Sequence, residues 1–168
     1  MGTFSTRIVR RGITSVQGFL ASGMHAGIKK DGRPDLALIT SQAVATAAGC
    51  FTRNRFKAAP LLVTREHLKT HQGRAIIVNS GNANACTGKR GYQDAKKMAQ
   101  WVAEALSLPM HQVYVASTGV ISEPLPMPKI QKAIPKVIAS LSSGGGHQAA
   151  QAMMTTDTFP KEFSLASR

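Results

Sequence analysis

The stretch Val113–Ser122, VYVASTGVIS, ends an apolar alternating run on two hydroxyl side chains and a glycine. Ser117 or Thr118 would act as a nucleophile only with a base in contact, and the neighbouring sequence supplies none. A G-x-S-x-G elbow is also absent, because these residues read ASTGV. The Thr118 hydroxyl and the Gly119 amide could instead donate to a developing oxyanion. A plain turn is the other interpretation that these residues allow.

Residues 79–88, NSGNANACTG, follow the clearest strand pattern in the chain. Their asparagine side chains and backbone N–H groups suit the capture of a carboxylate or a carbonyl oxygen. Asparagines of this kind also hydrogen-bond their own backbone in structured turns. Local chemistry leaves both interpretations open.

Consecutive polar side chains occur again in residues 153–161, MMTTDTFPK. Thr155, Thr156, Asp157 and Thr158 could cap a helix or a turn. They could equally hydrogen-bond an amino-acid substrate, so this segment is a second candidate binding element.

His67 and His71 lie four residues apart in EHLKTH, the spacing at which two histidines share one helix face and can bind a metal. No H-E-x-x-H order and no third ligand accompany them, so we expect a surface helix and no metal site. Cys50 and Cys86 have neither metal-binding nor redox spacing, which predicts reduced thiols in a cytosolic protein.

Hydrophobic periodicity predicts strands that alternate with helices. Strands are expected at 35–41, 74–80 and 112–117, and helices at 92–108, 126–141 and 147–154. The segment 59–68 is expected to begin as a strand and to turn helical within 64–70, and Pro135 should kink its helix or mark its true start. This alternation predicts one α/β domain over residues 1–168, with helices packed on a mixed sheet.

Lysine and arginine number 21 against eight acidic residues, a net charge of +13. Such a charge raises nucleic acid, an anionic substrate or an acidic partner chain as ligands. The basic residues form small scattered clusters, such as Lys29, Lys30 and Arg33, without interleaved aromatics that could stack on bases. We therefore expect no specific nucleic-acid recognition. No apolar run reaches the roughly 18 residues of a membrane span.

The N-terminus carries two weak targeting patterns. Residues 1–30 lack acids and include Arg7, Arg10 and Arg11, as transit peptides do, and MGTFST fits the loose myristoylation pattern. The apolar segment GFLASGMHAG, typical of a folded domain, follows directly and no cleavage-like site precedes it. We therefore expect neither a transit peptide nor myristoylation.

Five segments resemble, in this order and spacing, the bacterial bifunctional ornithine acetyltransferases, also called glutamate N-acetyltransferases, of the ArgJ family. They are GFLASGMHAGIKKDGRPDLALI, FTRNRFKAAPLLVTREHL, RAIIVNSGNANACTG, VASTGVISEPLPM and AMMTTDTFPKE. The resemblance extends from residue 18 to about residue 163, which is nearly the whole chain.

The resemblance implies an ArgJ-like α/β fold and transfer of an acetyl group from N2-acetyl-L-ornithine to L-glutamate in arginine biosynthesis. Some members also use acetyl-CoA, and no other cofactor or metal is implied. Members cleave themselves at an Ala-Thr bond, and the freed threonine becomes the nucleophile, with its own α-amine as the base. By resemblance, Thr118 and Gly119 form the oxyanion hole, and Thr155, with Thr156 as the neighbouring alternative, contacts substrate.

In the family the cleavage segment lies beyond the TTDTFPK stretch, whereas this sequence stops at Arg168. The chain therefore looks like most of an α chain, without the autoproteolysis segment and the β chain. The resemblance implies a cytoplasmic α2β2 heterotetramer with that β chain. A basic non-catalytic module that binds nucleic acid or an acidic partner is the alternative, and a non-catalytic fragment is a third interpretation.

On this interpretation the 168-residue chain alone has no acetyltransferase activity, because an oxyanion hole cannot replace an absent nucleophile. The check is glutamate acetylation from N2-acetyl-ornithine by the purified chain. Turnover well above a no-enzyme blank would show that the nucleophile lies within these residues.

Overall fold

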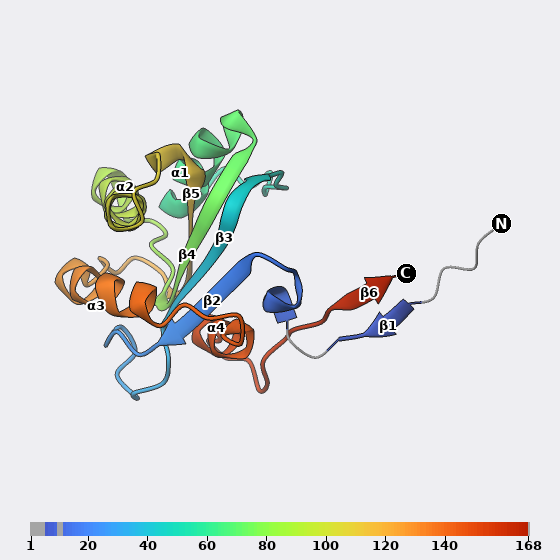
Figure 1. Cartoon of the computed structure of the whole chain (residues 1–168). Coiled ribbons are helices and arrows are strands. Elements are labelled where there is room, and N and C mark those ends of the chain that lie inside the picture. The colour runs from blue at the N-terminus through green and yellow to red at the C-terminus, as the bar shows by residue number, and fades with distance from the viewer. Residues whose placement is uncertain (1–5, 10–11, 168) are drawn as a thin grey trace.

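A four-stranded sheet forms the centre of the protein (Figure 1). The computed structural model describes residues 6–9 and 12–167, so Arg10, Arg11 and most of the MGTFST pattern lie outside it. The strands, in sheet order, are β2 (Phe19–Met24), β3 (Leu36–Thr46), β4 (Gln72–Asn82) and β5 (Val113–Val120). The β2/β3 and β3/β4 pairs are antiparallel, and β4/β5 is parallel. The expected mixed sheet is confirmed.

Helices cover both faces of this sheet (Figure 1). One face carries α1 (Ala59–His67), α2 (Gly88–Ala105) and α3 (Met127–Ala139), and the other carries α4 (Gly146–Met153). Short 3-10 turns lie at Gly12–Ser15, Leu68–Thr70 and Met110–Gln112. The strands β1 (Thr6–Ile8) and β6 (Leu165–Ser167) form a separate antiparallel pair, which places residues 6–8 beside residues 165–167.

Alternation along the strands divides the apolar residues between two cores. Leu36, Leu38 and Ile77 are buried against α1, α2 and α3. The intervening Ala37 and Val78 face α4, where the other core residues are alanines. Because these side chains are small, α4 lies very close to β2: a Cβ atom on Gly23 would stand 2.0 Å from the Gln148 carbonyl oxygen.

The expected strand at the start of 59–68 is wrong, because α1 is helical from Ala59 onward. Pro60 lies in the first turn, where its fixed φ angle suits a helix and its missing N–H costs nothing. Val63 and His67 are buried one and two turns further along, at helical spacing. A short apolar run such as APLLV does not by itself distinguish a strand from a buried helix.

Two helix boundaries and one strand also differ from the expectation. Pro135 does not mark the start of a helix, since α3 begins at Met127 and contains it. The helix expected at 92–108 spans Gly88–Ala105 instead. The strand β2 was not expected, because FLASGM has no β-branched residue and contains a glycine.

The close packing of α4 on β2 predicts that Gly23→Ala lowers the free energy of unfolding by about 1–3 kcal/mol, because neighbouring backbone would have to move. Gly144→Ala is the matched control, since a Cβ there meets only the Ser142 hydroxyl at 4.0 Å. Urea denaturation of both variants measures the difference. Equal stability of the two variants would contradict the close approach.

Candidate functional site

A hollow of about 450 Å³ lies at the carboxyl ends of β4 and β5. Parallel strands end at the same edge of a sheet, and α/β proteins bind ligands there. Its lining comes from four segments: Gly81 of β4; Thr118, Gly119 and Val120 of β5; Lys29 and Arg33 of the β2–β3 loop; and Thr155 and Thr156 after α4. The structure thus brings together Thr118, Gly119 and Thr155. Their chemical roles stay predictions, and Thr156 remains beside Thr155 as the alternative.

Gly119 is required by a close approach of the two strands. Its φ angle is 131°, and a Cβ atom there would lie 2.4 Å from the Gly81 carbonyl carbon and 2.5 Å from the Asn82 nitrogen. The β4/β5 register becomes irregular at this point, where Asn82 pairs with both Thr118 and Val120. Only glycine fits at this point, which lies at the edge of the hollow.

Ser117 and Thr118 have different surroundings, as alternation along a strand requires. The Ser117 hydroxyl donates to Oδ1 of the fully buried Asn79 at 2.6 Å. Thr118 lines the hollow. Of the two hydroxyls, the Thr118 group is therefore the one placed to meet a ligand.

The asparagines of the NSGNANACTG stretch hold the turn together. Asn79 donates to the Asn82 carbonyl at 2.8 Å, and Asn82 donates to the carbonyls of Glu123 and Pro124 at 3.1 and 3.2 Å. Asn84 donates to the Gly91 carbonyl at 2.8 Å. All three side chains are buried. These asparagine side chains therefore hold a structured turn, as the second interpretation expects. Of this stretch, only Gly81 lines the hollow.

The buried carboxylate of Asp35 organises the β2–β3 loop. It accepts hydrogen bonds from the backbone N–H groups of Ala26 at 2.5 Å, Ile28 at 2.7 Å and Lys29 at 2.9 Å. A carboxylate with several backbone donors is well satisfied away from water. The folded loop carries Lys29 and Arg33 to the hollow. The sequence shows these two residues only as members of a small basic cluster, and no sequence pattern predicts that they line a site.

Hydrogen bonds fix the backbone around Thr155. The Lys29 ammonium donates to the Met154 carbonyl at 2.6 Å and to the Pro34 carbonyl at 2.7 Å. Arg33 donates to the Thr155 carbonyl at 3.3 Å, and the Thr155 N–H donates to Asp157 at 3.1 Å. Burial, and then the neighbouring Arg33 charge, lower the pKa of Lys29 from its usual value. The hollow is thus bordered by two cations and by three threonines, Thr118, Thr155 and Thr156.

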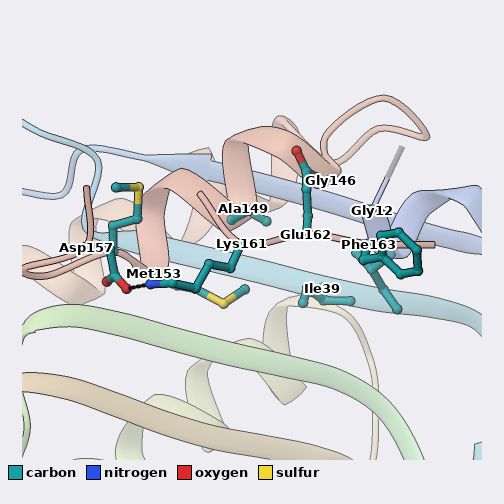
Figure 2. A pocket seen from close by; sticks show the side chains of 12 residues that line it. Gly12, Ile39, Gly146, Ala149, Met153, Asp157, Lys161, Glu162 and Phe163 are labelled. Atoms are coloured by element: carbon teal, nitrogen blue, oxygen red, sulfur yellow. Dashed lines mark hydrogen bonds and ion pairs between the residues drawn. The ribbon is translucent and has the colours of Figure 1, made fainter. Parts of the chain in front are cut away.

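A second hollow, of about 420 Å³, lies between α4 and residues 157–163 (Figure 2). Ile39, Ala149 and Met153 give it an apolar lining, and Asp157 forms an ion pair with Lys161 at one end. It contains none of Thr118, Gly119 and Thr155. Because Met154 and Asp157 line it, residues 154–157 separate the two hollows.

The expected surface helix with two histidines on one face is wrong. Helix α1 ends at His67, which is buried, with its Nδ1 atom 2.8 Å from the Val113 carbonyl oxygen. His71 follows a 3-10 turn and has a φ angle of 54°, so it does not continue that helix. Within residues 6–9 and 12–167, no group of three or more His, Cys, Asp or Glu side chains could hold a metal ion.

Fold and site together define an α/β protein with a hollow lined by cations and hydroxyl groups where its parallel strands end. The model of the ArgJ family matches residues 20–168, and the chain belongs to that family. It is 53% identical over 149 residues to the arginine biosynthesis bifunctional protein ArgJ of Caldanaerobacter subterraneus, covering 89% of this chain. It is 52% identical over 147 residues to that of Geobacter sulfurreducens, covering 88% of this chain. The chain spans only 37% of the length of each.

Two solved structures have the same fold. The ornithine acetyltransferase of Mycobacterium tuberculosis, complexed with ornithine, superposes with a TM-score of 0.93 and 45% identity, covering 96% of this chain and 88% of that chain. The ArgJ protein of Bacillus halodurans gives a TM-score of 0.90 and 38% identity, covering 99% of this chain and 93% of that chain. The ArgJ-like α/β fold is confirmed.

The strand approach predicts that Gly119→Ala destabilises the protein more than Gly88→Ala. Both positions have a positive φ angle, but a Cβ on Gly88 meets nothing within 4 Å. Backbone strain of about 1–3 kcal/mol therefore acts in both variants, and steric overlap adds about 1–3 kcal/mol only in Gly119→Ala. Thermal and urea denaturation measure the difference. If Gly88→Ala is the less stable variant, the close approach at Gly119 is wrong.

Proposed function

We propose that this chain supplies the oxyanion-binding and substrate-binding side of a glutamate N-acetyltransferase, which moves an acetyl group from N2-acetyl-L-ornithine to L-glutamate. The supporting observation is that Thr118, Gly119 and Thr155 line one hollow, although Thr155 is distant from the others in sequence. Membership of the ArgJ family supports the same activity. So does the likeness to a solved ornithine acetyltransferase in complex with ornithine.

In the proposed reaction the nucleophile is the N-terminal threonine of a β chain from the same precursor. Its hydroxyl attacks the acetyl carbonyl, and its own α-amine takes the proton. Negative charge then develops on the carbonyl oxygen, where the Thr118 hydroxyl and the Gly119 N–H donate hydrogen bonds. Collapse of the tetrahedral intermediate breaks the C–N bond while the α-ammonium group returns its proton to the leaving nitrogen, and ornithine leaves with a free amine. The glutamate amine attacks the acetyl-threonine by the same steps in reverse.

The charge of the hollow supports a substrate that carries a carboxylate. Lys29 and Arg33 border it, and both proposed substrates are amino acids with at least one carboxylate. Acetyl-CoA is the alternative acetyl donor, and the proposed mechanism needs no cofactor. The remaining positive charge would face an acidic β chain in a cytoplasmic α2β2 heterotetramer.

A basic nucleic-acid-binding module, the alternative raised by the net charge of +13, has no support in the family match or the fold. None of the helices within residues 6–9 and 12–167 has the length and apolar character needed to cross a membrane.

The oxyanion role predicts that Thr118→Ala, in the complete enzyme, lowers kcat more than it raises KM. A donor to the oxyanion helps more in the transition state than in the ground state, so the expected loss is roughly 10²- to 10³-fold, or about 3 to 4 kcal/mol. Thr118→Ser should retain much of the rate because it keeps the hydroxyl. Steady-state kinetics with N2-acetyl-ornithine and glutamate measure these values.

Ser117→Ala is the matched control. It leaves Oδ1 of buried Asn79 without the Ser117 donor, so it should cost stability, about 1–3 kcal/mol, with a much smaller loss of kcat. A folded Thr118→Ala enzyme with wild-type kcat, or a larger kcat loss in Ser117→Ala, would overturn the assignment.

A further inference from the structure

We propose that Lys29 is a positioning residue: its ammonium group joins the β2–β3 loop to the segment after α4 and so fixes the Thr155 wall of the hollow. This role rests on the proposed function for the identity of the substrate. The positioning of the Thr155 segment by Lys29 involves residues of this chain alone.

The ammonium meets the end of α4. Met154 is the C-terminal cap of that helix, and its carbonyl accepts from Lys29 at 2.6 Å across 125 residues of sequence. Carbonyl groups at a helix C-terminus carry partial negative charge, so a cation there is stabilising. A second N–H of the same ammonium donates to the Pro34 carbonyl at 2.7 Å. These two bonds occupy two of the three donors of the ammonium.

Lys29 is itself held in place, as a positioning residue must be. Its backbone N–H donates to the buried Asp35 carboxylate at 2.9 Å. Its side chain also passes over the end of β4, because a Cβ atom on Gly81 would lie 2.9 Å from Lys29 Cγ. The residue therefore contacts the strand end that meets Gly119 as well as the Thr155 segment. It sets the distance between two walls of the hollow.

The Thr155 segment depends on such contacts. Residues 154–163 contain neither helix nor strand, so no strand ladder of backbone hydrogen bonds fixes them. The Thr155 carbonyl accepts from Arg33 at 3.3 Å, and the Arg33 guanidinium also pairs with Asp31 at 2.7 Å. The two short bonds of Lys29 are stronger, because a charged donor makes them.

The test compares Lys29→Met, Lys29→Arg and Lys30→Met. Lys30→Met is the matched control, because Lys30 is the exposed neighbour and does not line the hollow. The first measurement is amide hydrogen exchange in the 168-residue chain. Losing hydrogen bonds from a charged donor should speed exchange of the Thr155 amide, which donates to Asp157, about tenfold or more in Lys29→Met, without faster exchange in β3 and β4. Lys29→Arg should retain part of the protection, and Lys30→Met all of it.

The second measurement is kinetic, in the complete enzyme. Displacement of the segment that carries Thr155 should weaken substrate binding. Lys29→Met should therefore raise KM for N2-acetyl-ornithine about tenfold and leave kcat within about threefold of wild type. Unchanged exchange at Thr155 in a folded Lys29→Met chain overturns the proposal whatever the activity. A loss of kcat without a change in KM also overturns it. If the wild-type complete enzyme transfers no acetyl group, the proposed function is refuted. Hydrogen exchange at Thr155 then still tests the positioning role of Lys29.

Discussion

Strands β4 and β5 approach each other so closely at their carboxyl ends that a side chain at position 119 would overlap the backbone of Gly81 and Asn82. The geometry of the hollow depends on this contact, because the β4/β5 register becomes irregular where Thr118 and Gly119 lie. A larger residue would push the strands apart and move the two proposed oxyanion donors. Such donors act only when held within a fraction of an ångström of their working position. The glycine is therefore both a packing requirement and a condition for the proposed chemistry.

Two kinds of polar residue surround that contact. The buried side chains of Asp35, Asn79, Asn82 and Asn84 are occupied by internal hydrogen bonds and hold loops in shape. The hydroxyl and cationic groups of the hollow stand on the backbone that these residues fix. Buried polar networks of this kind rigidify a site when each member has partners. Substitution of a loop-holding asparagine would thus affect the site indirectly, through the backbone.

Much of the fold could be predicted from hydrophobic pattern. The strands at 74–80 and 112–117 and the helices α2, α3 and α4 are confirmed, with shifted boundaries. The APLLV run does not reveal its helix because so short an apolar run cannot distinguish a strand from a helix by periodicity. Strand β2 is not predicted because its small residues match the close approach of α4, a tertiary feature. At the site, the neighbouring sequence does not decide whether Thr118 and Gly119 form a plain turn or an oxyanion hole. Only the family resemblance singled out Thr155, and contacts across 125 residues brought Lys29 to it.

The most direct test of the central claim is a crystal structure of the complete protein with N2-acetyl-ornithine bound and the nucleophilic threonine replaced. The account predicts the acetyl carbonyl oxygen within about 3 Å of the Thr118 hydroxyl and the Gly119 nitrogen, with Thr155 or Thr156 in contact with the same ligand. Binding of the ligand in the apolar hollow beneath α4, or with its acetyl group away from Thr118, would contradict the account.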